Sequence, residues 1–114
     1  MIEETVKIYL ENNGISAPVL MEIPKKNPPS EYFIIEKTGG ALENHIFSST
    51  LTIQSYALSK YEAAKASEEL VKLMVYGLIN EPDIVKVEVE GPYDFTDLQN
   101  KQYRYQAVFD IVHY

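Results

Sequence analysis

The chain has 114 residues, the size of one domain that can bury its own hydrophobic core. It lacks cysteine, which excludes disulfide bonds, thiolate metal sites and cysteine nucleophiles. Its net charge is −7, from 10 Lys and Arg residues against 17 Asp and Glu residues. Tight binding of nucleic acid normally requires a basic face, so this balance predicts no tight binding to DNA or RNA.

Hydropathy predicts a folded chain that does not enter the membrane. No apolar run approaches the roughly 20 residues that a helix needs to cross a bilayer. The first residues, Met1 to Glu4, are acidic and lack the positive start of a secretory signal. Hydrophobic residues make up 46% of the chain and charged residues 24%, as in an ordinary globular domain.

The first half of the chain predicts one short helix and three strands. Apolar residues recur at helical spacing over residues 2–12, and alternation or apolar runs predict strands at 18–23, 31–38 and 46–57. Residues 24–30 contain three prolines and are expected outside the sheet, because proline has no amide hydrogen to donate. Gly39-Gly40 is expected to break the second strand, with residues 41–45 forming the tip or an irregular loop.

The strand at 46–57 has one apolar face and one polar face. Phe47, Leu51 and Ile53 share the first face, whereas Ser48, Thr50, Thr52 and Gln54 share the second. The second face carries hydroxyl and amide groups and no charges, so a partner could cover it.

The second half predicts a long helix followed by two strands. Ser59 and Glu62 form a capping box at the start of a helix that ends near Asn80 and Pro82. A strand is predicted at 84–90, with Val85, Val87 and Val89 pointing inward. An acidic, aromatic loop is predicted at 91–101, before a last strand at 102–114.

The order of elements, α-β-β-β-α-β-β, predicts an α+β fold in a single domain covering residues 1–114. We expect a mainly antiparallel sheet with the long helix and the short N-terminal helix packed on one face. A doubly wound α/β fold would need repeated βαβ units, and only one long helix is available as a crossover.

Few residues suggest catalysis or metal binding. His45 lies in a polar turn and His113 near the end of the last strand, and neither has a carboxylate at a catalytic or ligand spacing. Acidic groups at Glu43 and at Asp94 to Asp97 lack the spacing of a calcium loop. We therefore expect a protein that is not an enzyme and needs no cofactor or metal.

Four segments together resemble a known family: residues 31–40 (EYFIIEKTGG), 51–57 (LTIQSYA), 61–64 (YEAA) and 103–114 (YRYQAVFDIVHY). They are similar to small tail components of tailed bacteriophages and of prophages in Gram-positive bacteria, above all to tail terminator (tail completion) proteins. The resemblance extends over nearly the whole chain, including its length and the order of its elements.

The resemblance implies a structural role in virion assembly. Such proteins form a homomeric ring, hexameric in that family, which caps the head-proximal end of the tail tube and stops its polymerisation. The implied partners are other copies of the chain, the tail tube protein and a head-completion or connector protein, with DNA passing through the ring. The implied location is the tail or neck of the virion, and the bacterial cytoplasm during assembly.

Two segments are candidates for the protein interface because of their expected exposure and their composition. The first is the predicted turn with Gly39, Gly40, Glu43, Asn44 and His45, and the second is the predicted loop with Tyr93 and Phe95. Exposed aromatic residues in such a loop are typical anchors for a partner.

Three alternatives remain open at the level of sequence. The chain could be another neck or head-tail connector component, which only its binding partners would distinguish. It could be a small α+β ligand-binding module, or a small enzyme that uses His45 or His113 with an acidic partner.

Overall fold

A computed structural model describes the whole chain, residues 1–114, and has the expected α+β architecture. Its first half contains the helix α1 and the strands β1, β2 and β3, and its second half contains the helix α2, two short helical turns and the strands β4 and β5. Their bounds are α1 Ile2–Asn12, β1 Val19–Leu20, β2 Tyr32–Glu43, β3 Ile46–Ala57, α2 Lys60–Lys72, η1 Leu73–Gly77, η2 Leu78–Asn80, β4 Ile84–Asp94 and β5 Tyr103–His113. No helix is both long and apolar enough to span a membrane.

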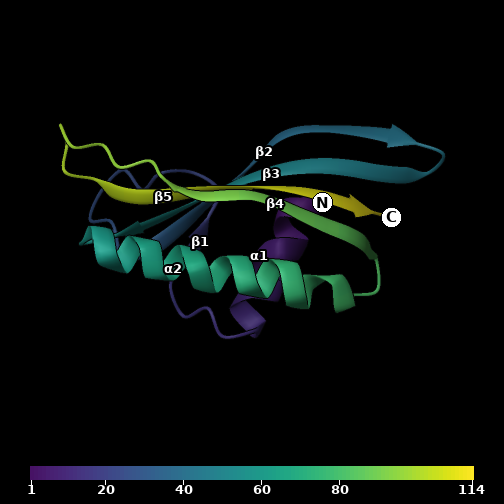
Figure 1. Cartoon of the computed structure of the whole chain (residues 1–114), viewed down its shortest axis with the longest axis horizontal. Helices are drawn as coiled ribbons and strands as arrows, with labels where there is room; N and C mark the ends of the chain where they lie inside the picture. Colours follow the sequence, from purple (N-terminus) through teal and green to yellow (C-terminus); the bar gives the residue numbers. More distant parts are fainter.

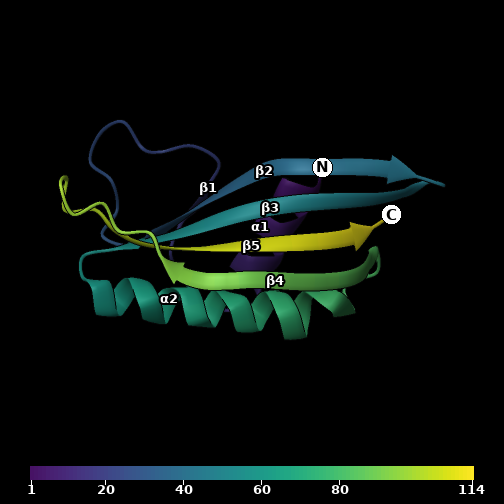
Figure 2. The ribbon, with the colours of Figure 1, turned by 45° about the horizontal axis from the view of Figure 1, so that its top comes forward.

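The five strands form one sheet in the order β1-β2-β3-β5-β4. Only β1 pairs in parallel, with β2, and the other neighbours are antiparallel. The long helical segment carries the chain from β3 to the edge strand β4, and β5 then returns between them (Figures 1 and 2). This arrangement confirms the predicted mainly antiparallel sheet.

Both helices pack on the same face of the sheet. Their apolar residues share one core cluster with side chains of β2, β3 and β5, and Figure 2 shows both helices below or behind the sheet. Core residues with no exposed surface include Val6 and Leu10 from α1, Leu70 from α2, Met74 from η1, and Leu51, Ile53, Phe109 and Ile111 from the sheet. The predicted packing of both helices on one face of the sheet is therefore confirmed.

A hydroxyl from α1 fixes the distance between the two helices. The Tyr9 hydroxyl donates a hydrogen bond of 2.9 Å to the Leu73 carbonyl, where α2 widens into the π-helical turn η1. Gly77 faces that hydroxyl, and a Cβ atom at this position would collide with it. The glycine therefore permits the close approach of Tyr9.

The first two strands differ from the prediction at 18–23 and 31–38. β1 has only two residues, and Met21 and Ile23 are exposed beyond it. β2 does not stop at Gly39-Gly40 but continues to Glu43, with an interruption in its pairing with β3 between Lys37 and Gly39. The predicted break was wrong because the 12-residue strand β3 offers pairing partners along the whole of β2.

The turn of this hairpin consists of Asn44 and His45, with φ angles of 52° and 66°. A two-residue hairpin turn needs left-handed backbone at its central residues, and Asn is among the residues that adopt it most readily. Gly39 and Gly40 instead lie within a paired strand. A Cβ atom at Gly40 would lie 2.9 Å from the Ser48 carbonyl oxygen, which explains a small residue there.

Strand β4 is longer than predicted and less buried. It extends to Asp94, with its pairing to β5 interrupted between Glu90 and Tyr93, so the loop begins only at Phe95. Val87 is partly buried, but Val85 and Val89 are exposed. The expectation of three inward valines was wrong, because β4 is an edge strand whose pairing is shifted between Ile84 and Lys86.

Candidate functional site

The residues singled out in the sequence lie at opposite ends of an elongated molecule. The principal extents are 45 × 25 × 25 Å, and the β2–β3 turn and the β4–β5 loop lie at the two ends of the long axis (Figure 1). We call residues 39–50 the hairpin end, and residues 93–104 together with Tyr56 and Lys60 the loop end. Ile46 and Tyr56 lie ten positions apart in β3, which corresponds to roughly 33 Å along a strand.

The hairpin end extends beyond the helical layer (Figure 1). It contains five of the predicted interface residues: Gly39, Gly40 and Glu43 in β2, and Asn44 and His45 in the turn. Leu42 and Phe47 pair across the hairpin and are 61% and 39% exposed. The end of the hairpin therefore presents apolar surface beside a carboxylate.

His113 lies in the last strand, β5, and is buried on the face of Phe109 and Ile111. Its Nε2 atom lies 2.8 Å from the Ser49 Oγ atom, and its Nδ1 atom lies 3.2 Å from the Tyr114 carbonyl oxygen. A serine–histidine pair can act as nucleophile and base when a substrate reaches the hydroxyl. Ser49, however, is only 1% exposed, so this pair satisfies two buried polar side chains and offers no accessible nucleophile.

The loop end brings Tyr93 and Phe95 together with Arg104, the only arginine of the chain. The Tyr93 and Phe95 rings meet edge to face, with their centres 6.5 Å apart. Tyr93 is 40% exposed and Phe95 is 43% exposed. The Arg104 guanidinium carbon lies 4.8 Å from the centre of the Phe95 ring and 5.9 Å from that of Tyr56. Its Nε donates to the Phe95 carbonyl at 2.7 Å, and its Nη1 donates to the Tyr56 hydroxyl at 3.3 Å.

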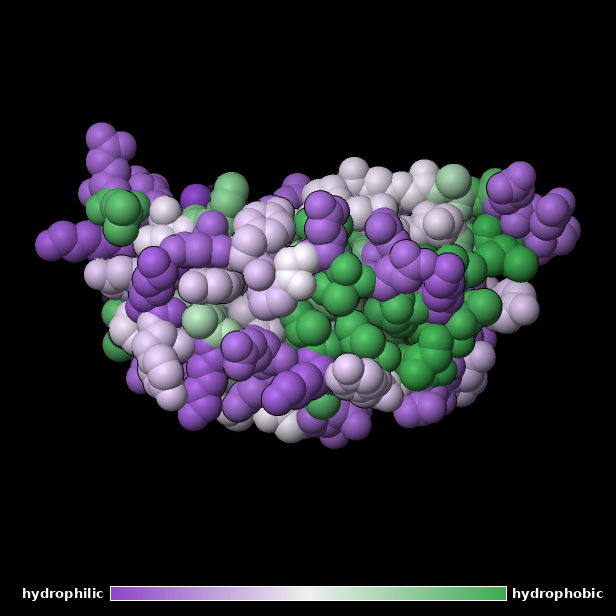
Figure 3. Space-filling view, in the orientation of Figure 1, coloured by the Kyte–Doolittle hydropathy of each residue, from purple (hydrophilic) through white to green (hydrophobic).

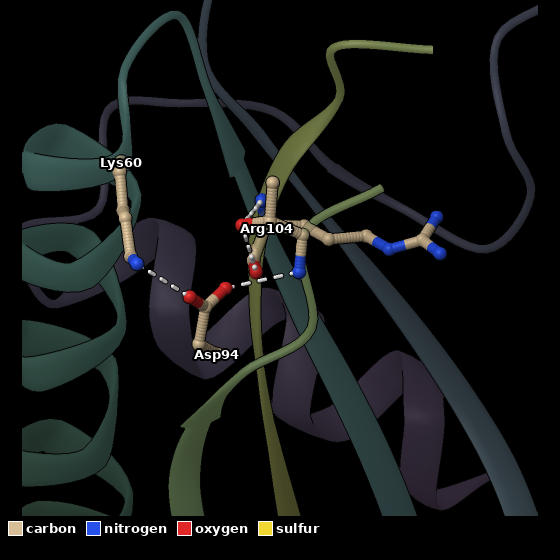
Figure 4. Close-up of polar contacts among 4 residues, drawn as sticks. Lys60, Asp94 and Arg104 are labelled. Carbon is tan, nitrogen blue, oxygen red and sulfur yellow. Dashed lines mark hydrogen bonds and ion pairs between the residues drawn. The ribbon is translucent and has the colours of Figure 1, made fainter. Parts of the chain in front are cut away.

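Asp94 anchors this loop to the start of α2 (Figure 4). Its carboxylate lies 2.9 Å from the Lys60 ammonium and accepts a hydrogen bond of 3.0 Å from the Thr96 amide. Hydrogen bonding from the Thr96 side chain, then from Lys60 and the Thr96 amide, lowers the pKa of Asp94 from 3.8 to about 2. The Arg104 side chain points away from Asp94, so this carboxylate does not neutralise the guanidinium.

The rest of the loop is an ordered turn. The Asp97 carboxylate accepts hydrogen bonds from the amides of Gln99 and Asn100 and from the Asn100 side chain. Bonding from the Asn100 side chain contributes most to lowering the pKa of Asp97. Asp97 also pairs with Gln102 across the loop through two backbone hydrogen bonds of 3.0 Å.

A chain of polar side chains connects this end to the sheet face opposite the helices. The Tyr56 hydroxyl donates to Gln54, Gln54 donates to Gln106, and Gln106 donates to the Tyr93 hydroxyl. The polar face predicted for β3 is therefore organised by bonds between β3, β4 and β5. Tyr56 also stacks on Tyr32, with ring centres 4.6 Å apart.

Sequence reasoning found Tyr93 and Phe95 but missed Arg104, Tyr56 and the two glutamines. The available signal was that Arg104 is the only arginine in an acidic chain. Its aromatic neighbours come from two other segments, and only the pairing of β3 with β5 brings Tyr56 opposite Arg104.

A hydrophobic area covers part of the remaining surface. Figure 3 shows it on the side where α2 and β4 lie. Among the exposed hydrophobic residues of the chain are Ile79, which follows α2, and Val85 and Val89 of β4. No cluster of three or more His, Asp or Glu side chains lies close enough to hold a metal ion.

No protein-family model matches this sequence, and no curated protein matches it. The functional argument therefore starts from the two ends of the molecule and from the composition of their surfaces.

Proposed function

We propose that this chain is a structural subunit that assembles head to tail into a homomeric ring. The observation that carries this proposal is the position of two dissimilar candidate surfaces at opposite ends of one elongated domain. A contact between two different surfaces repeats from copy to copy, and it forms a ring when the rotation between copies closes. A single surface in contact with its own copy would instead stop at a dimer.

The ring acts at the head-proximal end of a bacteriophage or prophage tail tube. This part of the proposal rests on the resemblance of residues 31–40, 51–57, 61–64 and 103–114 to tail terminator proteins. In that role the ring ends tube polymerisation and provides the surface to which the filled head joins. Its partners are the tube protein and a head-completion or connector protein, and six copies are expected by the same resemblance.

A structural role also agrees with the chemistry of the two histidines. His113 is bonded to a buried serine, and His45 lies in the hairpin turn. The net charge of −7 supports a ring through which DNA slides without adhering, because acidic surfaces repel the phosphate backbone. Retention of DNA by the protein at micromolar concentration and low salt would contradict this part of the proposal.

The decisive experiment combines mass measurement with imaging. We expect light scattering over a concentration series to detect a ring, either for the protein alone or when purified tail tubes are added. Negative-stain images should then locate the ring at one end of each tube. A chain that remains monomeric and does not bind tubes would reject the terminator role. Binding to head connectors alone would instead indicate another neck component, and a thermal shift with metabolites would favour a ligand-binding module.

A further inference from the structure

The charged residues are unevenly distributed along the long axis. Six of the 10 Lys and Arg residues lie in segments 21–31, 56–66 and 93–104: Lys25, Lys26, Lys60, Lys65, Lys101 and Arg104. All three segments lie on the side of the molecule that carries the loop end: Figure 2 shows the segment between β1 and β2 there, Glu31, Tyr61 and Lys65 line one hollow, and Lys60 pairs with Asp94. These three segments contain five of the 17 Asp and Glu residues. The rest of the chain contains the other 12 acidic residues and only four Lys residues. The side of the molecule that carries the loop end is thus close to neutral, whereas the rest of the molecule is strongly negative.

Arg104 forms no ion pair within the chain, although its charge contributes to lowering the pKa of Asp97 in the same loop. The three ion pairs are Lys7–Glu11, Lys60–Asp94 and Lys86–Glu88, and none includes the arginine. Its guanidinium is already held over Phe95 and Tyr56 and bonded through Nε and Nη1. Because this position is held before any partner arrives, little conformational entropy is lost when a carboxylate binds the free edge of the guanidinium.

The hairpin end offers a carboxylate in a matching setting. Glu43 is exposed next to the Asn44–His45 turn and takes part in none of the three ion pairs. Leu42 beside it is largely exposed, and Phe95 and Leu98 are exposed at the loop end, Leu98 at 79%. Each end therefore combines apolar surface with an unpaired charge, and the two charges are of opposite sign.

We infer that the loop end of one copy receives the hairpin end of the next copy, with the Arg104 guanidinium binding the Glu43 carboxylate. This inference rests on the proposed head-to-tail assembly and specifies its contact. Within one chain the two residues cannot meet, because the length of β3 separates them. A pair between residues 43 and 104 must therefore join two copies.

Zero-length cross-linking tests the contact directly. Arg104→Lys keeps the positive charge and provides an amine that a carbodiimide can join to a neighbouring carboxylate. We expect mass spectrometry to find a 43–104 linkage in covalent dimers and larger species, and to lose it in Arg104→Lys with Glu43→Gln. The internal Lys60–Asp94 pair, at 2.9 Å, serves as the positive control. Formation of the 60–94 linkage without any 43–104 linkage would overturn the inference.

Charge reversal provides a second, independent measurement. We expect Arg104→Glu or Glu43→Arg alone to raise the protein concentration needed for half-assembly by about tenfold or more, as for other close interfacial charge pairs. The double variant should return to within about threefold of the unmodified chain. The matched control is Lys72→Glu, an exposed position on α2 between the two ends, which should leave assembly unchanged. An equal loss in the single and double variants would contradict the pairing.

The two proposals can fail separately. A ring that requires the 43–104 contact but does not bind tail tubes would remove the tail role and leave the contact intact. A ring that caps tubes and is insensitive to both charge reversals would leave the tail role intact and overturn the contact.

Discussion

At the scale of single residues, the contact of Tyr9 with Gly77 illustrates how one side chain connects two helices. The Tyr9 hydroxyl enters the space that the missing Cβ atom of Gly77 leaves, and it bonds the Leu73 carbonyl. Burial is the main cause of the raised pKa of Tyr9, and the charge of Glu81 adds to it. The hydroxyl therefore remains protonated and able to donate at neutral pH.

We expect Gly77→Ala to destabilise the protein although alanine favours helices. Alanine gains about 1 kcal/mol over glycine within a helix, whereas overpacking a buried contact costs about 1–3 kcal/mol. The Tyr9→Phe variant itself loses about 1 kcal/mol of stability with its hydrogen bond. In that variant Gly77→Ala should lower the free energy of unfolding by less than in the unmodified chain, because the hydroxyl that meets the new Cβ atom is gone. Urea unfolding of the four proteins measures this coupling. A stabilising effect of Gly77→Ala in the unmodified chain would refute the explanation.

Asp94 predicts a pH dependence of stability. Its pKa is about 2 in the folded chain, below the ordinary value of 3.8, so its charged form favours folding. This contribution is complete above about pH 4 and decreases as the pH falls through the folded pKa. We expect Asp94→Asn to lower the melting temperature slightly at neutral pH, with the difference from the unmodified chain decreasing below about pH 4 and disappearing below about pH 2.

The control for this prediction is Lys60→Met, which removes the ion pair but leaves Thr96 in place. Because the Thr96 side chain contributes most to the shift, the pKa of Asp94 in this variant should lie between about 2 and 3.8. Carboxyl-carbon NMR titration measures both values. A midpoint near 3.8 in the unmodified chain would show that these bonds do not form in solution.

At the scale of elements, the β2–β3 hairpin shows where local sequence signals are insufficient. Gly39-Gly40 and Asn44-His45 are both typical of turns, and sequence reasoning ended the strand at the first pair and placed the tip or an irregular loop at residues 41–45. The observed turn is the second pair, because pairing along the full length of β3 leaves Glu43 opposite Ile46. Which of two local signals forms the turn is thus decided by long-range pairing, which no window of a few residues contains.

We expect the stability of this hairpin to depend on the backbone of His45. Its φ of 66° costs about 1–2 kcal/mol for a residue with a Cβ atom, so His45→Gly should stabilise the protein by up to about 1 kcal/mol. His45→Val should destabilise it by about 1–2 kcal/mol, since β-branched residues disfavour this region. His45→Asn is the matched control and should have little effect. Thermal unfolding that ranks valine above glycine would contradict the observed turn.

Regular elements with a clear period were predicted closely. The helix at 2–12, the capped helix start at Ser59 and the strand at 46–57 follow from apolar spacing and one hydrogen bond, and all three are confirmed. The burial of β4 was not predictable in this way. Its alternating valines look like a covered strand, but its place at the sheet edge depends on β5 inserting next to β3.

At the scale of the whole molecule, the order of elements was sufficient to predict the α+β class and the position of both helices on one face. The candidate interface residues come from two segments of the sequence, and their separation along the long axis could be seen only once the strand directions were known. The composition of the loop end also emerged only from the fold, because Tyr56, Asp94 and Arg104 come from three different strands or loops.

Assembly between two different ends makes a prediction that an assembly of identical surfaces does not make. Arg104→Glu blocks the loop end and leaves the hairpin end intact. Leu42→Glu blocks the hairpin end and leaves the loop end intact, and the exposure of Leu42 means that this change should not unfold the chain. At the protein concentration at which the unmodified chain is half-assembled, each variant alone should remain monomeric, because every contact would include one blocked surface.

Mixing the two variants should produce a dimer and no larger species. The intact hairpin end of the Arg104→Glu chain can bind the intact loop end of the Leu42→Glu chain, but the two remaining ends carry additional acids that repel each other. Light scattering of the equimolar mixture against each variant alone measures this outcome. The control is a mixture of Arg104→Glu with Lys72→Glu at the same total concentration. In this mixture only the Lys72→Glu chain has both ends intact, so it can form assemblies longer than a dimer. The Arg104→Glu chain should limit the length of these assemblies, because it can bind at only one of its ends. Rings in the Arg104→Glu and Leu42→Glu mixture, or monomers only, would reject end-to-end assembly, because two half-blocked chains retain one productive contact and only one.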